Sequence, residues 1–307
     1  MLKLNEISPI GLGAIVLEKD NTVWVEPNEF IQMLDIATQE YGINYLDSAT
    51  RYGDCEKYIG KWLKESSIAR ESILIGSKIS SEELTGEAVI EGVDKSLQQV
   101  GTDYFDIYWV HSWDGKTPYE NTISGFDRSI NEGKIRSYGV CHVSVSDLQK
   151  IFLTCEENNF PKPSFVQNLF SLATLSQESL DTIKFCQEND IVFTAASPLA
   201  GGILTGKYSF NQDLPVDSRW KHWAKSGGLP KYWTKELFDS IDCFKNEVEN
   251  KNTSMTSLAI SWVSNYPGVN CTLVGPRNLK QLQSVQDSYS IELEKRDIDK
   301  YFSIFKN

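Results

Sequence analysis

Short apolar runs alternate with amphipathic segments along the whole chain, and this alternation limits the possible folds more than any other feature. Eight runs read as buried β-strands, and each is followed by a segment whose apolar residues recur at helical spacing. Strands that alternate with helices usually pair in parallel, because each helix returns the chain to the starting edge of the sheet. Eight such units in 307 residues predict an α/β protein, a (β/α)8 TIM barrel formed as a single domain over residues 1–307.

The expected elements follow from this periodicity. The strands are residues 10–14, 44–49, 72–79, 104–111, 135–142, 165–170, 191–197 and 271–274. The first helix begins at Pro27 or Asn28, and the others are residues 55–66, 87–100, 117–132, 146–158, 177–189, 236–251, 253–266, 278–289 and 294–305. Ser146 is the expected N-cap of its helix. Residues 198–235 show no clear periodicity, and a stretch of that length is often functional.

A doubly wound open sheet is the alternative to a barrel. That fold normally carries an early Gly-x-Gly-x-x-Gly fingerprint, in which each glycine has its own role near a bound pyrophosphate. Gly11 and Gly13 match the first two positions, but the third glycine is missing. The barrel is therefore the favoured fold.

Composition argues against several classes of function. The net charge of −12 disfavours a nucleic-acid partner, because phosphates attract a basic surface. The chain has no run of about 18 apolar residues and no apolar stretch at its start, so we expect no membrane partner and a cytoplasmic location. Six scattered cysteines and three histidines show no metal-ligand spacing, so we expect reduced thiols and no metal site.

Four residues with complementary chemistry fall at the carboxyl ends of consecutive expected strands or in the loop just beyond: Asp47, Tyr52, Lys78 and His111. In a barrel these ends meet at one mouth. A free tyrosine, with a pKa near about 10, is a slow acid at neutral pH, but a neighbouring ammonium group stabilises its phenolate. Asp47 could hold Lys78 charged, and His111 could hydrogen-bond a substrate oxygen. Taken alone, each residue has a simpler structural interpretation: Asp47 as a turn cap, Tyr52 as a packing ring, Lys78 as a surface charge and His111 as a buried histidine. The set of four together predicts proton donation to a carbonyl oxygen.

Three of these residues, Asp47, Tyr52 and His111, lie in motifs that resemble those of the aldo-keto reductases. The matching motifs are Gly11-Leu-Gly13, Asp47-Ser-Ala-Thr-Arg-Tyr52-Gly53 with Glu56 and Gly60, Gly101-Thr-Asp-Tyr104-Phe-Asp106-Ile-Tyr-Trp-Val-His111, Gly133-Lys-Ile-Arg136-Ser-Tyr-Gly139-Val and Ser197-Pro-Leu-Ala-Gly-Gly202-Ile-Leu-Thr-Gly206-Lys-Tyr208. The resemblance covers nearly the whole chain. Residues 198–208, with Ser218-Arg219 and Tyr232-Trp233, look closest to the aflatoxin-aldehyde reductase branch.

The resemblance implies a (β/α)8 barrel that reduces an aldehyde or ketone to an alcohol with NADP(H), with NAD(H) as the alternative cofactor. The catalytic tetrad of the family falls on Asp47, Tyr52, Lys78 and His111. Tyr52 is then the general acid, tuned by Lys78 and Asp47, while His111 orients the carbonyl. These roles agree with those expected from the residues themselves.

The resemblance also implies a set of cofactor contacts, namely Cys141, His142, Gln167, Ser197, Leu199, Gly201, Lys207, Gly275, Arg277 and Gln281. Cys141-His142 stands where the family usually has a Ser-Asn pair at the carboxamide, and Ala196 stands where an aromatic ring usually stacks on nicotinamide. Ser284-Val285 replaces the Glu-Asn pair at the adenine. A helix N-terminus beside Arg277 suits a phosphate and favours NADPH.

Two other functions stay open. The altered contacts suit a cofactor-binding sensor or auxiliary subunit with little turnover, and a dedicated biosynthetic reductase or dehydrogenase is the other alternative. The expected partner is a small carbonyl substrate, with the chain as a monomer or a homodimer. Five loop tryptophans either line an apolar substrate pocket or pack beneath loops: Trp24, Trp113, Trp220, Trp223 and Trp233.

Overall fold

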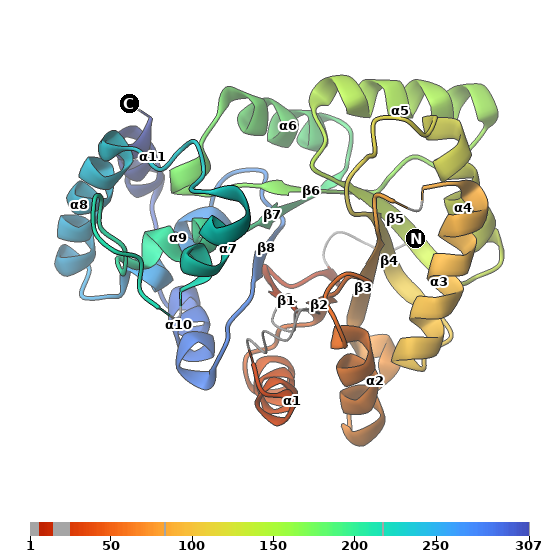
Figure 1. Ribbon diagram of the computed structural model, residues 1–307, viewed down its shortest axis with the longest axis horizontal. Coiled ribbons are helices and arrows are strands. Elements are labelled where there is room, and N and C mark those ends of the chain that lie inside the picture. The colour runs from red at the N-terminus through yellow and green to blue at the C-terminus, as the bar shows by residue number, and fades with distance from the viewer. Residues whose placement is uncertain (1–5, 15–24, 83, 217, 307) are drawn as a thin grey trace.

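A computed structural model describes residues 6–14, 25–82, 84–216 and 218–306. Eight parallel strands pair in chain order, and β1 also pairs with β8, so the sheet closes on itself (Figure 1). The strands are β1 (Ile10–Gly13), β2 (Tyr45–Asp47), β3 (Leu74–Ile79), β4 (Phe105–Val110), β5 (Ile135–Cys141), β6 (Phe165–Leu169), β7 (Val192–Ala196) and β8 (Cys271–Val274). The predicted TIM barrel is confirmed, because an open sheet would leave two strands with an unpaired edge.

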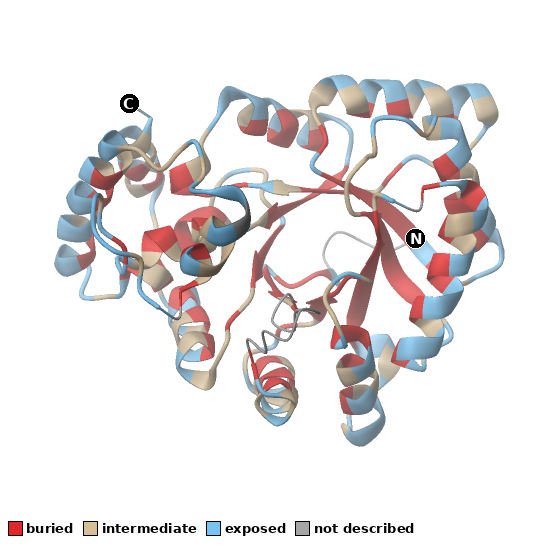
Figure 2. Cartoon of the chain, in the orientation of Figure 1, coloured by how far each residue is buried: buried red, intermediate tan, exposed pale blue. Residues whose placement is uncertain are grey.

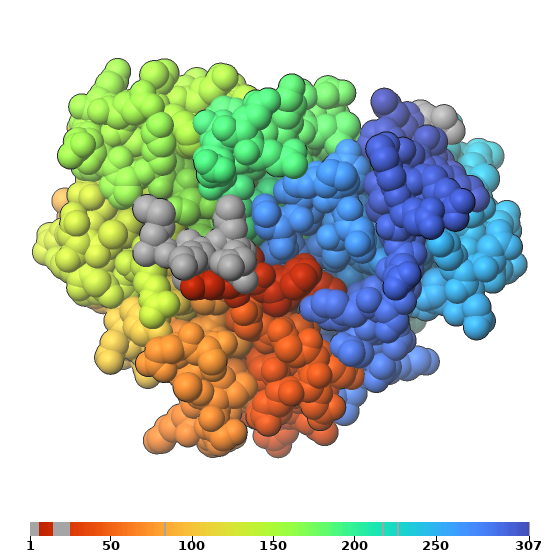
Figure 3. Space-filling model, turned by 180° about the vertical axis from the view of Figure 1, so that it is seen from behind, coloured from red at the N-terminus to blue at the C-terminus, as the bar shows by residue number. Residues whose placement is uncertain are grey.

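Helices surround the barrel and turn their buried faces toward it (Figure 2). They are α1 (Pro27–Asp35), α2 (Cys55–Glu65), α3 (Gly86–Val100), α4 (Tyr119–Asn131), α5 (Val145–Asn158), α6 (Gln177–Glu188), α7 (Arg219–Gly227), α8 (Lys235–Asn250), α9 (Met255–Ser264), α10 (Leu279–Tyr289) and α11 (Lys295–Phe305). Four shorter turns accompany them: η2 (Ile36–Glu40), η3 (Arg70–Ser72), η4 (Leu172–Thr174) and η5 (Ala200–Thr205). From behind, the chain runs around the rim in order, from orange through yellow and green to blue (Figure 3).

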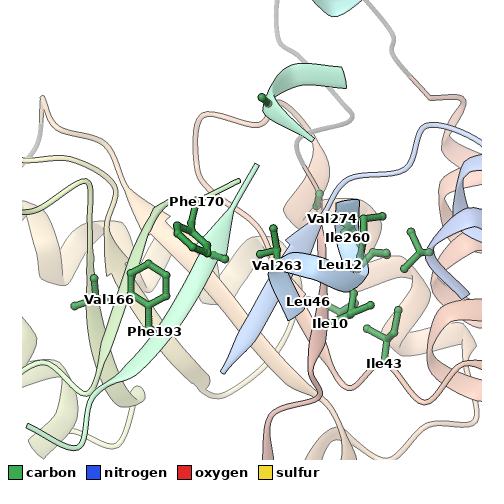
Figure 4. Close-up of a cluster of buried hydrophobic side chains, with 14 of the residues drawn as sticks. Ile10, Leu12, Ile43, Leu46, Val166, Phe170, Phe193, Ile260, Val263 and Val274 are labelled. Carbon is green, nitrogen blue, oxygen red and sulfur yellow. The ribbon is translucent and has the colours of Figure 1, made fainter. Parts of the chain in front are cut away.

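The strands separate two apolar layers, because successive strand residues point to opposite faces. Leu12 and Leu46 lie in the layer between strands and helices, where they meet Ile260 and Val263 of α9 (Figure 4). The second layer fills the inside of the barrel and consists of Ile7, Tyr45, Leu74, Ile107, Trp109, Cys141, Phe165, Val192, Cys271 and Leu273. Side chains therefore fill the barrel beneath its mouth, among the residues that the structure describes.

Ser146 is not the N-cap of α5, so that prediction was wrong. The cap is Ser144, whose hydroxyl accepts from the Asp147 N–H at 3.1 Å, while the Asp147 carboxylate accepts from the Ser144 N–H at 3.2 Å. The reciprocal hydrogen bonds with Asp147, three positions after the cap, place the start of α5 at Ser144. Ser146 lies inside the first turn.

Residues 198–235 are more ordered than their sequence pattern predicts. They contain η5 and α7, and α8 begins at Lys235. Gly201 and Gly202 both have positive φ and break the helical pattern within η5. The short helix α7 carries only two large apolar side chains, both tryptophan, so its periodicity was too weak to detect. Trp24 lies outside the described residues.

Candidate active site

The four predicted catalytic residues lie together at the carboxyl ends of β2, β3 and β4. Asp47 is the last residue of β2, Lys78 is the next-to-last residue of β3, and His111 directly follows β4. Tyr52 comes from the loop after β2. Parallel strands place these ends at the same edge of the barrel, so residues far apart in the chain become neighbours.

Lys78 is the centre of the group. Its side chain is 0% exposed, and its ammonium group donates to the Asp47 carboxylate and, at 2.8 Å, to the Ser48 carbonyl. The same ammonium lies 5.3 Å from the centre of the Tyr52 ring. The Tyr52 hydroxyl is 3.4 Å from Nε2 of His111. The four side chains thus form a continuous chain of contacts from a buried carboxylate to the mouth.

The loop that carries Tyr52 is tied to β3. Thr50 donates twice to the Lys78 carbonyl, from its N–H at 3.2 Å and from its hydroxyl at 3.1 Å. The Tyr52 N–H then closes a turn onto the Ala49 carbonyl at 3.0 Å, and Gly53 follows with φ +63°. A glycine suits this position because other residues rarely adopt positive φ. The tyrosine is therefore held by backbone contacts rather than by packing alone.

Burial and the Lys78 charge set the protonation states of the site. Burial raises the pKa of Tyr52 to about 12, against the opposing effect of Lys78. Burial alone would lower the pKa of Lys78, but Asp47 and Tyr52 reverse this effect and raise it. Burial, together with the charges of Lys78 and nearby side chains, lowers the pKa of His111 to about 3. At neutral pH the phenol is protonated, the ammonium is charged and the imidazole is neutral.

Sequence reasoning missed one residue of this site, Tyr45. Its hydroxyl donates to Oδ1 of Asp47 at 2.8 Å, while the Asp47–Lys78 pair uses Oδ2. Tyr45 is 0% exposed and reads as an ordinary apolar strand residue. The available signal was its spacing, since a residue two positions before Asp47 on a strand points to the same face.

Glu56, which belongs to the tyrosine motif, supports the site from outside the barrel. It is buried on α2 and accepts a hydrogen bond from the Ser77 hydroxyl at 2.5 Å. Burial raises the pKa of Glu56, while Ser77, Ser96 and Lys78 oppose this effect. The contact joins α2 to β3 one residue before Lys78.

Three residues predicted to contact nicotinamide lie together where β5 and β6 end. Cys141 and Gln167 are register partners across these strands, and the His142 N–H donates to the Gln167 carbonyl at 3.0 Å. Nε2 of Gln167 is 3.4 Å from Oδ1 of Asp47, which joins this group to the tetrad. Cys141 is buried, and His142 is exposed with φ +56°. The structure therefore brings this half of the predicted site beside the catalytic group.

The predicted phosphate end of the site is basic. Burial lowers the pKa of Lys207 to about 8, and the charges of Arg277 and Arg219 add to the effect. In a chain with a net charge of −12, a lysine whose pKa is lowered by two nearby arginines fits the binding of an anionic phosphate. The structure thus places the predicted residues Lys207 and Arg277 within electrostatic range of each other. Arg219, which the sequence indicated only as part of a motif, lies within the same range of Lys207.

The remaining predicted phosphate contacts lie on two loops of the same mouth. Ser197 and Leu199 precede η5, and Gly201 lies within it with φ +67°. Gly275 directly follows β8, and Gln281 lies in the first turn of α10, where its side chain accepts from the Arg277 N–H at 2.9 Å. These positions agree with the predicted arrangement of a loop and a helix N-terminus.

The loop tryptophans that the structure describes are buried or half-buried. Trp220 is 7% exposed, donates to the Ala200 carbonyl at 3.2 Å and contacts the rings of Trp223 and Trp233. Trp113 packs against Tyr119 with ring centres 4.6 Å apart. The packing interpretation is therefore favoured for Trp220, which supports the loop above the barrel rather than a pocket wall.

Within the described part of the chain, no group of three or more His, Cys, Asp or Glu residues is arranged to hold a metal ion. The helices of that same part are all too short or too polar to cross a membrane. What the mouth does contain is a buried acid–base group and, on the loops that follow β7 and β8, the cations Lys207 and Arg277.

Comparison with known proteins gives this arrangement a family. The model of the aldo/keto reductase family matches residues 9–304, and the chain belongs to that family. The family comprises oxidoreductases that reduce carbonyl compounds with NAD(P)H. A thermostable aldo-keto reductase, crystallised with the inhibitor epalrestat, shares the fold with a TM-score of 0.75 over 97% of this chain and 95% of its own, at 20% identity.

Curated relatives carry several different names. An L-glyceraldehyde 3-phosphate reductase of Escherichia coli O157:H7 is 30% identical over 80% of this chain and 74% of its own length. An aldo-keto reductase of Bacillus subtilis is 26% identical over 98% of this chain and 91% of its own. A probable voltage-gated potassium channel subunit beta of Arabidopsis thaliana is 23% identical over 91% of this chain and 86% of its own.

Proposed function

We propose that this protein is an NAD(P)H-dependent reductase of an aldehyde or ketone, with Tyr52 as the general acid. The observation that carries the proposal is the contact of Tyr52 with both a buried, charged Lys78 and a neutral His111. When bound, the nicotinamide cofactor supplies the hydride. The side chains of the tetrad supply the proton and the geometry.

Each residue has a distinct task in this proposal. Tyr52 holds its proton at neutral pH, because burial raises its pKa to about 12, and gives it to the carbonyl oxygen as that oxygen gains negative charge. Lys78 stabilises the phenolate that remains, and Asp47 keeps the ammonium in place. His111 is neutral and lies beside the Tyr52 hydroxyl, where it orients the same oxygen.

The cofactor contacts form part of the proposal. Cys141, His142 and Gln167 would hold the nicotinamide end, next to Asp47. The phosphates would lie against Ser197, Leu199, Gly201, Lys207, Gly275, Arg277 and Gln281. Lys207 and the two arginines near it, Arg219 and Arg277, support NADP(H), which carries one more phosphate than NAD(H), and NAD(H) is the alternative.

The test is aldehyde reduction followed by the loss of NADPH or NADH absorbance. Phosphorylated short aldehydes belong in the panel because of the reductase relative at 30% identity, and aromatic aldehydes because residues 198–208 resemble the aflatoxin-aldehyde branch. Tyr52→Phe should lower kcat by about a hundred-fold or more, since positioned acids contribute that much. Tyr104→Phe is a matched control, because its buried hydroxyl has no hydrogen-bond partner among the described residues. Equal rates for Tyr52→Phe and the wild type would refute the acid role.

A second candidate is a cofactor-binding auxiliary subunit with little turnover. The relative named as a channel subunit favours it, as do Cys141-His142 and Ala196 at positions that usually grip and stack nicotinamide. This candidate predicts cofactor binding by fluorescence without reduction of any aldehyde tested. A narrow response to one substrate in the same panel would instead favour a dedicated biosynthetic enzyme.

A further inference from the structure

A tyrosine that belongs to none of the predicted roles lies directly beneath the tetrad. Tyr45 starts β2 and points into the barrel, in the same layer as Trp109. Its hydroxyl donates to Oδ1 of Asp47 at 2.8 Å and accepts from Nε1 of Trp109 at 3.1 Å. A chain of hydrogen bonds therefore runs from the interior of the barrel to Lys78.

The direction of this chain is fixed by the chemistry of its members. An indole N–H can only donate, so Trp109 occupies a lone pair of the Tyr45 oxygen. The single phenolic proton must then go to Asp47, which accepts it as a carboxylate. Burial raises the pKa of Tyr45 well above its usual value, and the charge of Asp47 raises it further. Tyr45 therefore stays a donor to Asp47 at any pH at which the protein works.

The neighbouring strands leave room for this ring. A Cβ on Gly11 of β1 would lie 2.7 Å from Cδ1 of Tyr45, and a Cβ on Gly76 of β3 would lie 2.7 Å from its hydroxyl oxygen. Both distances are shorter than a contact between non-bonded heavy atoms, so any residue larger than glycine at either position would displace the phenol. The two strands that flank β2 thus both carry glycine where the ring approaches.

We propose that Tyr45 is a positioning residue, which fixes Asp47 and shares its charge so that Lys78 can act fully on Tyr52. Tyr45 contacts neither the substrate nor the cofactor in this proposal. The inference rests on the proposed function, because it concerns the same proton donor.

The electrostatic sign of the effect follows from the geometry. The two carboxylate oxygens of Asp47 have different partners: Oδ1 accepts from Tyr45 at 2.8 Å and from Gln167 at 3.4 Å, and Oδ2 pairs with Lys78. Without the phenolic proton only the longer contact to Gln167 remains on Oδ1, so more of the negative charge of Asp47 faces Lys78 and cancels the ammonium charge that Tyr52 experiences. Less positive charge near Tyr52 raises its pKa. Loss of the Tyr45 hydroxyl should therefore make Tyr52 a weaker acid.

The experiment compares Tyr45→Phe with the wild type in kinetics and in the ionisation of Tyr52. We expect kcat to fall about ten-fold, the typical effect of losing a hydrogen bond to a charged group, with unchanged KM for the cofactor. In alcohol oxidation, where the positive ring of the oxidised cofactor brings the ionisation of Tyr52 into range, the pH break should move upward by about one unit. The midpoint of the Tyr52 resonance, followed by ¹³C NMR of tyrosine Cζ with the oxidised cofactor bound, should move in the same direction.

Two further variants separate positioning from stability. Tyr45→Phe leaves Trp109 Nε1 without its acceptor, so the double variant Tyr45→Phe/Trp109→Phe removes both partners and should show the same upward shifts with better folding. Tyr138→Phe removes another buried phenol, which donates to the Pro161 carbonyl at 2.9 Å on the far side of β5, and should leave the pH break in place. An equal shift in Tyr138→Phe would overturn the proposal, as would wild-type values in both Tyr45 variants.

Failure of this inference can be distinguished from failure of the proposed function. If the wild type reduces no aldehyde, or if Tyr52→Phe retains its rate, the proposed function is wrong. The ¹³C titration of Tyr52 still decides the role of Tyr45 in that case, since it needs no turnover. If the reductase is active and depends on Tyr52 while neither Tyr45 variant changes kcat or the titration, only the positioning role is refuted.

Discussion

The ammonium group of Lys78 lies 5.3 Å from the centre of the Tyr52 ring, and the Lys78 side chain is fully buried from solvent. Its charge is balanced by Asp47, which accepts from it directly. A cation at this distance in a dry site acts on the phenol far more strongly than it would in solvent. Lys78 is therefore placed to control the ionisation of Tyr52, the proposed proton donor.

Replacing Lys78 with methionine should reduce both activity and stability. The change leaves the buried Asp47 carboxylate without its cation, which typically costs about 3–5 kcal/mol. Without the ammonium, nothing offsets burial and the charge of Asp47, which both raise the pKa of Tyr52, so this pKa rises and kcat falls. Urea unfolding and steady-state kinetics measure the two effects.

The double variant Asp47→Asn/Lys78→Met separates these two effects. It removes both charges, so much of the lost free energy of unfolding should return, while kcat should stay low. A double variant that regained activity together with stability would show that Lys78 serves only the fold.

The binding of NADPH should weaken as the pH rises above about 8. Burial and the nearby arginines lower the pKa of Lys207 to about 8, so this side chain is charged below that pH and neutral above it. A bound phosphate favours the charged form, hence affinity should be highest below pH 8 and decline above it. Fluorescence titrations between pH 6.5 and 9.5 measure the trend.

Lys207→Met provides the control for this pH dependence. The variant should bind NADPH more weakly at pH 7 and should show little change in affinity across the same pH range. An affinity that falls equally in the wild type and in Lys207→Met would assign the titration to another group.

The fold and the proximity of the four candidate residues could be predicted because they depend on local patterns. Buried strands and helices repeat along the chain, and a parallel barrel brings every strand end to one mouth. Asp47, Lys78 and His111 needed only this rule to become neighbours. The phosphate-end residues were found through the resemblance, and the structure adds that Lys207 and Arg277 lie within electrostatic reach of each other.

The parts that were missed depend on contacts that no local pattern records. Tyr45 reads as an apolar strand residue, and its hydrogen bond to Asp47 appears only when both are placed on the inner face of β2. Ser144 is the N-cap of α5 because it forms a reciprocal pair of hydrogen bonds with Asp147, and the capping propensity of serine at position 146 does not reveal this pair. The helix α7 has a weak apolar pattern because its buried ring, Trp220, contacts a loop rather than the barrel.

His111 should stay neutral from pH 5 to pH 8. Burial and the charge of Lys78 lower its pKa to about 3, so protonation begins only in acid well below this range. Proton–nitrogen NMR of the imidazole, with the signal assigned by its loss in His111→Gln, should show no titration between these limits. A midpoint near 6.5 would mean that the ring is more solvated than its position beside Tyr52 indicates.

Removal of the Asp106 charge should destabilise the barrel. Asp106 is buried on β4, pairs with Arg70 at 2.9 Å and Arg136 at 3.0 Å, and accepts from the Ile75 N–H at 2.9 Å. Asp106→Asn should lower the free energy of unfolding by about 3 kcal/mol, because two cations lose their shared partner. Chemical denaturation measures this change.

Asp103→Asn is the matched control for this experiment, since Asp103 is exposed three residues earlier in the chain. Its effect should stay within about 0.5 kcal/mol, as is usual for surface positions. Similar losses in both variants would show that the effect reflects charge in general rather than the ion pairs at Asp106.

Restoring an amide at position 142 should tighten the grip on nicotinamide. Asparagine is usual at this position in the family, and it tolerates the left-handed backbone that His142 adopts, with φ +56°. An amide offers both a donor and an acceptor to a carboxamide, whereas a neutral imidazole has one nitrogen of each kind in a fixed ring. His142→Asn should therefore lower the Kd for NADPH several-fold while leaving the Kd for adenosine 2′,5′-bisphosphate, which lacks nicotinamide, unchanged. Calorimetric titration with both ligands measures the two Kd values. An equal change in both Kd values would place the effect at the phosphate end. No change in either Kd would show that His142 already serves the carboxamide as well as asparagine does.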